Sequence, residues 1–350
     1  MQIYKKVTRR IAAHTKGLSP TAFAIVMATG IISNSAYSLG MKTLALALFY
    51  INATAYVMVW GISLIRTVRY PRQVLADLLN HSRVSGFFTS VAATCVLGTQ
   101  MILIFGNYYI ASALWLFGLV LWVGLTYTIF TGLIIKENKP SLAEGINGAW
   151  LLAVVSTQSI ALLSAQLALY FGTYKLAMNF FALSMWLWGG MLYIWMISLI
   201  FYRYMFFKFS PSDLTPPYWI NMGAMAISTL AGTALITNTP HAPFLLSILP
   251  FLKGFTVFYW ATGTWWLPML FILGIWRHIY KRFPLRYDTL YWGAVFPLGM
   301  YTACTLALEQ SMNLPFLEPF PHYFFFVALF AWCVTFLGLV YSLVRPITAK

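Results

Sequence analysis

Long apolar runs separated by short polar breaks repeat along the whole chain. A helix needs roughly twenty consecutive apolar residues to cross a hydrocarbon core about 30 Å thick, and the runs have about that length. They predict ten helices, at residues 20–38, 43–65, 84–105, 109–135, 146–170, 175–202, 217–236, 250–280, 289–308 and 322–344. Pro250 and Pro268 interrupt the eighth run, and apolar sequence already begins near Pro243, so we expect a short interfacial segment there that leads into a kinked span.

The composition is that of a membrane protein and excludes a water-soluble fold. Of the 350 residues, 61% are hydrophobic and 8% are charged, whereas a soluble domain carries roughly a quarter charged residues. The basic start of the chain is not followed by a short apolar region with a small-residue cleavage site, so we expect no removable signal peptide. Cys95, Cys304 and Cys333 each fall within a predicted helix, and we interpret them as small core residues rather than disulfide partners or metal ligands.

The positive net charge of +15 is spread over short loops between the apolar runs. This distribution argues against nucleic acid as a partner and is typical of membrane topology. When alternate loops are assigned to the cytoplasm, all of the 22 basic residues except Lys42, Lys175 and Lys253 fall on that side. We therefore expect a multi-pass protein of the plasma or inner membrane with both termini in the cytoplasm. The predicted parts are a basic cytoplasmic segment at 1–19, a transmembrane domain at 20–344 and a cytoplasmic tail at 345–350.

The odd-numbered predicted helices share a pattern that the even-numbered ones lack. Each begins near an aromatic residue that is followed by small, polar or flexible residues, and these aromatic residues are Phe23, Phe88, Trp150, Trp219 and Trp292. One helical hairpin repeated five times predicts a ring of five hairpins around a central pore. Because small and hydroxyl residues favour close packing of membrane helices, we expect an all-α membrane fold with five inner odd-numbered helices and five outer even-numbered helices.

Two positions in each inner helix are candidates for lining the pore. Four residues after the aromatic residues stand Met27, Ala92, Val154, Gly223 and Phe296, and two residues further on stand Thr29, Thr94, Ser156, Met225 and Leu298. Phe296 is the one bulky planar side chain among smaller neighbours and could plug the pore, while Pro297 predicts a kink beside it. The alternative interpretation is ordinary small-residue packing between membrane helices.

Three inner helices begin with a capping residue or a proline, at Ser19–Pro20, Thr215–Pro217 and Asp288–Thr289. In the assigned orientation, the positive ends of these helix dipoles face the cytoplasm beside the basic loops. Both features raise the local concentration of anions. For any single helix, simple capping explains the residues equally well.

The predicted spans contain no carboxylate at mid-membrane, where proton-coupled carriers usually keep an ionisable residue. Glu309 stands at the outer end of the ninth helix, which we interpret as a solvated helix end. This absence favours channel-like or uncoupled passage. The histidines have no metal-like spacing, and no Ser-His-Asp grouping or phosphate-binding loop is present. We therefore expect neither an enzyme nor a metal or cofactor site.

Residues 20–33 (PTAFAIVMATGIIS) and 291–301 (YWGAVFPLGMY) resemble the tellurite-resistance/C4-dicarboxylate transporter family. That family includes bacterial tellurite-resistance proteins, fungal malate transporters and the slow anion channels of plant guard cells. The resemblance implies a homotrimer in which each subunit has its own pore within five inner and five outer helices. It also implies that a phenylalanine on the ninth helix, matched here by Phe296, occludes the pore. The third inner helix lacks the proline that the channels have there, so the resemblance is closer in fold than in pore shape.

Our leading functional hypothesis is passive or weakly coupled passage of small anions, such as chloride, nitrate or a C4-dicarboxylate like malate, through a pore blocked by Phe296. Hydroxyls at Thr29, Thr94 and Ser156 would replace part of the ion's hydration shell. A proton-coupled dicarboxylate or tellurite-resistance carrier is the first alternative, with Glu309 or a loop histidine as the coupling group. A membrane sensor or scaffold is the second alternative.

Overall fold

The computed structural model describes residues 15–348, so most of the predicted segment 1–19 and the last two residues of the predicted tail lie outside the described residues. Within the described range every regular element is a helix and no strand is present. The inner helices are α2 (Ala24–Ser38), α5 (Phe88–Phe105), α8 (Leu152–Leu167), α10 (Ile220–Thr237) and α13 (Trp292–Met312). The outer helices are α3 (Lys42–Arg69), α6 (Tyr108–Ile135), α9 (Lys175–Phe206), α12 (Leu249–Ile275) and α14 (Pro319–Thr348).

The inner helices form a closed ring. In the order α2, α5, α8, α10, α13, each packs against the next, and α13 packs back against α2. Each inner helix also packs against the outer helix that follows it in sequence, from which it is separated by a short connection. The predicted arrangement of five hairpins, with odd-numbered helices inside and even-numbered helices outside, is confirmed.

Eight of the described helices are long and apolar enough to cross a membrane, namely the five outer helices and α5, α8 and α10. The other two ring helices, α2 and α13, carry more polar residues, among them Ser33, Asn34 and Thr302, and these three side chains are buried. Both helices pack against α14, which lies between them and the outside of the molecule. Since they complete the ring alongside α5, α8 and α10, we count them as the remaining two spans.

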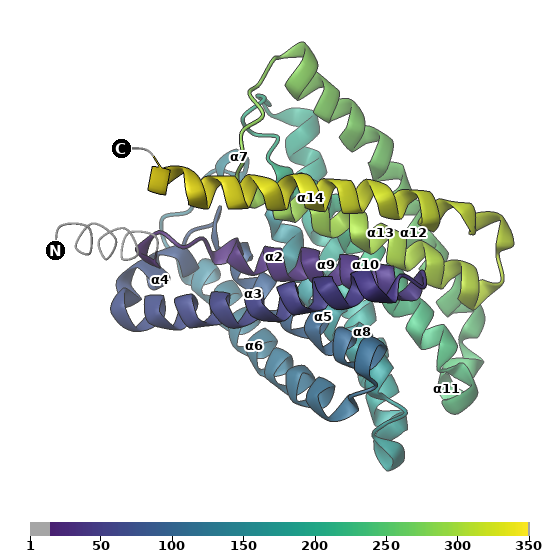
Figure 1. The fold of residues 1–350 in the computed structure, drawn as a ribbon. Helices are drawn as coiled ribbons and strands as arrows, with labels where there is room; N and C mark the ends of the chain where they lie inside the picture. The colour runs from purple at the N-terminus through teal and green to yellow at the C-terminus, as the bar shows by residue number, and fades with distance from the viewer. Residues whose placement is uncertain (1–14, 349–350) are drawn as a thin grey trace.

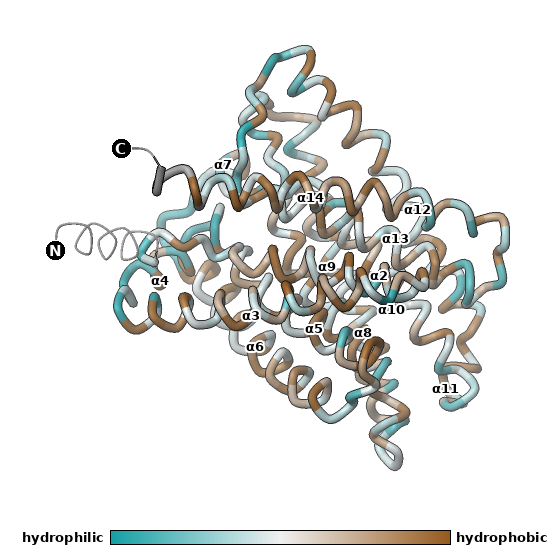
Figure 2. The backbone as a smooth tube through the Cα atoms, viewed as in Figure 1, coloured by the Kyte–Doolittle hydropathy of each residue, from teal (hydrophilic) through white to brown (hydrophobic). Residues whose placement is uncertain are grey.

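The outer helices present an apolar surface with polar ends. Large exposed side chains on them include Val120 on α6, Phe206 on α9 and Phe330 on α14, as expected for a surface that faces lipid. Figure 2 shows the apolar colouring along the outer helices and polar colouring at the loops near α4 (Pro71–Leu78) and α7 (Leu142–Gly145). The beginning of the described chain and the end of α14 lie at this same end of the molecule (Figure 1), which is consistent with an even number of spans.

Every inner helix begins with a tight 3₁₀ turn. These turns are η1 (Pro20–Phe23), η2 (Val84–Phe87), η3 (Gly148–Leu151), η5 (Pro216–Trp219) and η8 (Thr289–Tyr291). They contact one another in the same circular order as the helices that they precede, so the ring is also closed at this end. The five inner helices are therefore parallel, and all five N-termini lie at the same end of the ring.

Short helices lie between the spans. The predicted interfacial segment is present as α11 (Pro243–Ser247), and Pro268 lies inside α12, whose last turn continues into a π-helical turn at Trp276–Tyr280. The short helices α4 and α7 were not predicted from the sequence, because both lie in polar connections. The remaining short turns are η4 (Gly172–Tyr174), η6 (Thr239–His241) and η9 (Pro315–Leu317).

Each outer helix is hydrogen-bonded to the inner helix of the next hairpin. An aromatic side chain of the outer helix donates to a polar oxygen of the inner helix in all five cases. The pairs are Tyr56 to Thr94 (3.0 Å), Trp122 to Thr157 (2.9 Å), Trp186 to the Ser228 carbonyl (2.7 Å), Trp260 to Thr305 (3.0 Å) and Trp332 to Thr29 (3.0 Å). In a membrane interior such interhelical hydrogen bonds have no competing water, so they fix the rotation of each inner helix.

Glycines allow the inner helices and their first turns to approach closely. Gly148 in η3 is the tightest case against backbone, because a Cβ atom there would lie 2.6 Å from Tyr218 Cα and 2.7 Å from the Pro217 carbonyl oxygen of η5. These are backbone atoms, which cannot move aside as a flexible side chain can. Gly223 and Gly299 serve the same purpose between α10 and α13 and between α13 and α2.

Replacing Gly148 by alanine is expected to destabilise the fold by about 1–3 kcal/mol, the usual cost of overpacking. The measurement is the thermal unfolding midpoint of the purified protein in detergent. Gly61→Ala is the matched control, because nothing lies within 4 Å of a Cβ atom at Gly61 in α3. Its midpoint should stay the same or rise. Equal midpoints for the two variants would contradict the close approach of η3 and η5.

Candidate functional site

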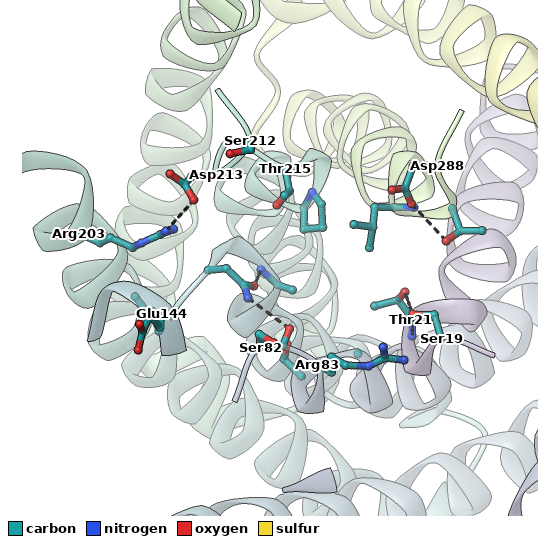
Figure 3. A pocket seen from close by; sticks show the side chains of 18 of the residues that line it. Ser19, Thr21, Ser82, Arg83, Glu144, Arg203, Ser212, Asp213, Thr215 and Asp288 are labelled. Atoms are coloured by element: carbon teal, nitrogen blue, oxygen red, sulfur yellow. Dashed lines mark hydrogen bonds and ion pairs between the residues drawn. The ribbon is translucent and has the colours of Figure 1, made fainter. Parts of the chain in front are cut away.

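A cavity of about 470 Å³ opens where the five N-termini meet. The residue that precedes each 3₁₀ turn lines it in every case, and these residues are Ser19, Arg83, Asn147, Thr215 and Asp288. Figure 3 shows the side chains of this cavity, which we call the vestibule, arranged around the opening of the ring. The vestibule is thus built from equivalent positions of all five hairpins.

Three vestibule residues cap the turns that follow them. Ser19 Oγ accepts from the Thr21 N–H at 3.3 Å, Asn147 Oδ1 from the Ala149 N–H at 2.9 Å, and Asp288 Oδ1 from the Leu290 N–H at 2.9 Å. Each helix N-terminus carries a partial positive charge of about half a unit. Five parallel N-termini around one opening therefore contribute a positive potential that favours anions, and the carboxylates of Asp288 and Glu144, which also line the cavity, offset part of it.

The wall of the vestibule next to α9 carries an ion pair. Arg203 Nη2 lies 3.5 Å from Asp213 Oδ1, and Arg203 Nη1 donates to the Tyr218 hydroxyl (Figure 3 shows the ion pair). Burial raises the pKa of Asp213, but hydrogen bonds from Ser210 and the charge of Arg203 outweigh it, so this pKa lies below its usual value. Asp213 therefore stays ionised near neutral pH, and its ion pair with Arg203 persists in this pH range.

Two buried polar atoms of the vestibule lining have no hydrogen-bond partner among the described residues. They are the Ser85 hydroxyl oxygen and Arg203 Nε, in side chains that are almost completely buried. An unpaired buried donor is costly in free energy. A bound water beside either atom would therefore be stabilising.

Below the vestibule, the ring closes. The next cavity along the axis has a volume of about 10 Å³, which is no more than the space that a single water needs. One residue from each inner helix surrounds it, in the set Ala24, Thr89, Leu152, Ile220 and Gly293. Met27 and Phe296, one turn further along α2 and α13, also line it and are 1% exposed. An anion cannot pass this level without movement of side chains.

The same helix faces define the next level of the ring. Residues three or four apart lie on one face of a helix, so one turn beyond the first ring stand Met27, Ala92, Val155, Gly223 and Phe296. All five are buried. Pro297 packs against α10, because a Cβ atom at Gly223 would lie 2.7 Å from its Cγ. By this helical spacing, four of the five residues predicted four positions after the aromatic residues fall on one level, with Val155 in the place of Val154.

Three of the five predicted residues two positions further along contact outer helices. Successive residues of a helix are about 100° apart, so positions i and i+2 differ by about 200° and cannot both face the axis. Thr29 accepts a hydrogen bond from Trp332, Thr94 accepts one from Tyr56, and Met225 lies beside Gly263 of α12. All three contacts are with outer helices.

Two predicted residues have no contact that directs them to an outer helix. The Ser156 hydroxyl donates to the Ala153 carbonyl of its own helix, and Leu298 is buried in α13. In α8, the residue equivalent to Thr29 and Thr94 is Thr157, which binds Trp122. The repeat in α8 is therefore displaced by one residue from the register that the aromatic residue Trp150 predicts.

A third cavity, of about 180 Å³, lies on the far side of the closed level. We call it the outer cavity. All five inner helices contribute to it, and its polar lining residues are Asn34, Ser38, Thr99, Gln166 and Gln310. Among residues 15–348, no charged residue lines the outer cavity or the narrow cavity above Phe296. Gln310 lines the outer cavity whereas its neighbour Glu309 does not.

The sequence analysis did not single out Ser85, Arg203 or the amide residues of the outer cavity. A signal for Asn34 was present, because it follows Met27 by seven residues and so lies on the same helix face. Arg203 lies at the end of an outer helix and reaches the vestibule only through the fold. No sequence pattern available to us marks it.

Comparisons with known proteins agree with this architecture. A sequence model of the SLAC1 family, described as voltage-dependent anion channel, matches residues 17–340. An uncharacterized membrane protein of Mycobacterium tuberculosis is 39% identical over 156 residues, which is 45% of this chain and 79% of that protein. An uncharacterized transporter of Methanocaldococcus jannaschii is 26% identical over 334 residues, or 92% of this chain and 94% of the other. A sulfite efflux pump of Trichophyton rubrum is 25% identical over 348 residues, or 92% and 90%.

Proposed function

Because the chain belongs to the SLAC1 family, we propose that it moves small anions along the axis of its five-helix ring. The SLAC1 family is the tellurite-resistance/C4-dicarboxylate transporter family that the sequence resembles, and the match covers nearly the whole chain. The observation that carries the proposal is the axial series of a vestibule with five helix N-termini, a closed apolar level and a neutral polar cavity.

In the proposed path, an anion enters the vestibule, where the helix dipoles favour it, and meets the closed level. Phe296 is the proposed gate, because it lines the narrow cavity and is the largest of the five side chains one turn beyond the first ring; Trp292, at the start of α13, also borders this cavity. Met27, Ala92, Val155, Gly223 and Phe296 are the proposed lining of the gate level. Rotation of the Phe296 ring would open a way between the two cavities without breaking any hydrogen bond, since the ring makes none.

The proposed substrates are small inorganic anions, with C4-dicarboxylates such as malate and tellurite-type oxyanions as further candidates. The relative named as a sulfite efflux pump supports a small oxyanion. The outer cavity of about 180 Å³ supports the same size class, since a water occupies about 30 Å³ in the liquid. It would hold a small anion together with several of its waters.

Channel-like passage is favoured over proton coupling, because no titratable carboxylate or histidine lines the narrow level or the outer cavity. We also propose a homotrimer in the cell membrane with cytoplasmic termini, in which each subunit carries its own path because the ring closes within one chain.

The proposed function is tested with the purified protein in liposomes that contain chloride, nitrate or sulfite. A channel should give anion efflux that follows an imposed membrane potential and persists without a pH gradient. A coupled carrier should lose net uptake when the pH gradient is removed. Absence of flux for all of these anions and for malate, in the wild type and in Phe296→Ala, would contradict the proposal and favour the sensor or scaffold.

A further inference from the structure

The outer cavity contains two side-chain amides with unused hydrogen-bonding capacity. Asn34 is 4% exposed, its Oδ1 atom is buried without a partner, and no described residue bonds its amide nitrogen. Gln166 Oε1 accepts from the Thr99 hydroxyl at 2.9 Å, which leaves the Gln166 amide nitrogen without a described partner. Asn34 and Gln166 come from α2 and α8, and both line the same cavity.

The Asn34 Oδ1 atom is an acceptor and would bind a water, whereas the amide nitrogens of Asn34 and Gln166 are donors and can bind an anion. Leaving such groups without a partner is costly, so they usually bond to water or to a ligand. Asn34 lies on the axial face of α2, seven residues after Met27. Gln310 of α13 and Ser38 of α2 add further polar groups to the lining and have no side-chain hydrogen bond in the described chain. The lining therefore offers several unused N–H and O–H donors and no carboxylate.

We propose that the outer cavity is a binding site for a small monovalent anion, held by the amide nitrogens of Asn34 and Gln166. This inference deepens the proposed function and rests on it in placing the site on the path. Neutral amide donors replace part of an anion's hydration shell but attract it less than a lysine or arginine would. A site on a conduction path must bind strongly enough to admit an ion and weakly enough to release it. The amide pair provides this balance on the side away from the positive vestibule.

The test uses bromide as the probe, because its anomalous X-ray scattering locates it directly. Crystals of the full-length protein are soaked in sodium bromide, and we expect an anomalous peak between Asn34 and Gln166. Asn34→Asp keeps the shape of the side chain but adds a negative charge, and Gln166→Glu does the same on the opposite wall while still accepting from Thr99. Each variant should lower the bromide occupancy at least about tenfold, since a like charge at contact distance repels the anion by that much or more.

Asn138→Asp is the matched control, because Asn138 is exposed in the loop after α6, at the vestibule end of the molecule. It should leave the outer peak unchanged. A wild type without the peak, or a peak that persists in both Asn34→Asp and Gln166→Glu, overturns the proposal. Having two variants on different helices guards against misfolding of either one.

Anion flux of the same preparations separates this proposal from the proposed function. Flux without a bromide peak overturns the amide site and leaves anion passage intact. If the wild type shows the bromide peak but passes no anion, and both charged variants lose the peak, the binding site is supported and anion passage is contradicted. If the wild type conducts anions, the anion concentration that gives half-maximal flux from the outer side should be about tenfold higher in each charged variant than in the wild type.

Discussion

Phe296→Ala is expected to raise anion flux through the reconstituted protein by about tenfold or more, which corresponds to a barrier lowered by at least about 1.4 kcal/mol. Phe296 is 1% exposed and, with Met27, lies on the floor of a cavity of only about 10 Å³. Removing the ring is expected to join the vestibule to the outer cavity, because the other residues of the proposed gate level, Met27, Ala92, Val155 and Gly223, are smaller or flexible. The measurement is the rate of nitrate efflux from liposomes at a fixed membrane potential.

Phe88→Ala is the matched control for this prediction. Phe88 is also 1% exposed and lies in an inner helix, but its ring is 6.5 Å from that of Phe130 in the outer helix α6. Both truncations remove a buried phenylalanine and should cost stability, about 3–5 kcal/mol for a well-packed site. Only Phe296→Ala should raise flux. A folded Phe296→Ala protein with wild-type flux would refute the gate, and equal increases in both variants would indicate a non-specific leak.

The hairpin repeat could be predicted from the sequence because the membrane imposes it. Spans need a certain length of apolar residues, and small residues mark the helices that pack on other helices. The start of the first inner hairpin at Pro20 of η1 and the end of α5 at Phe105 follow directly from such runs. The short helices α4 and α7 could not be predicted, because neither spans a bilayer and neither has an apolar run.

Side-chain direction was harder to predict than helix position. Thr29 and Thr94 were expected on the pore because of their position in the repeat, yet each bonds to an aromatic side chain on a neighbouring outer helix. The helical angle between Met27 and Thr29 excludes both from the same face, and this argument needs only the sequence. The register of α8 could not be derived in this way, because Trp150 marks the start of the helix but Thr157 is the residue that the outer helix binds.

The amides of the outer cavity illustrate what only the fold reveals. Asn34 and Gln166 are distant in sequence and belong to helices that are not neighbours in the ring. Each one alone is consistent with a residue at the end of a membrane helix. Their shared cavity follows from ring closure, which places equivalent faces of all five inner helices around one axis.

Asp77→Asn is expected to destabilise the protein by about 3–5 kcal/mol, the usual cost of removing one partner from a buried ion pair. Asp77 lies in α4, where its carboxylate binds Arg66 Nη2 at 2.6 Å and Arg83 Nε at 2.8 Å. The Arg66 side chain is only 6% exposed, so it cannot recover its hydration when the carboxylate is neutralised. The measurement is the thermal unfolding midpoint in detergent, which should fall well below that of the wild type.

Asp288→Asn makes the same chemical change at an exposed position and serves as the control. Asp288 caps η8 through its side-chain oxygen, and asparagine caps a helix about as well as aspartate, so the midpoint should hardly change. Replacing the ion pair with apolar residues, as in Arg66→Met with Asp77→Leu, should recover much of the loss, because no buried charge is then left alone. An Asp77→Asn midpoint equal to that of Asp288→Asn would show that Arg66 is neutralised by another group. Arg83 borders the vestibule and loses its carboxylate partner in Asp77→Asn, so this variant should also show altered anion flux. The double variant Arg66→Met with Asp77→Leu removes the same carboxylate but should be more stable. Altered flux in both variants would therefore come from the vestibule charge and not from lost stability.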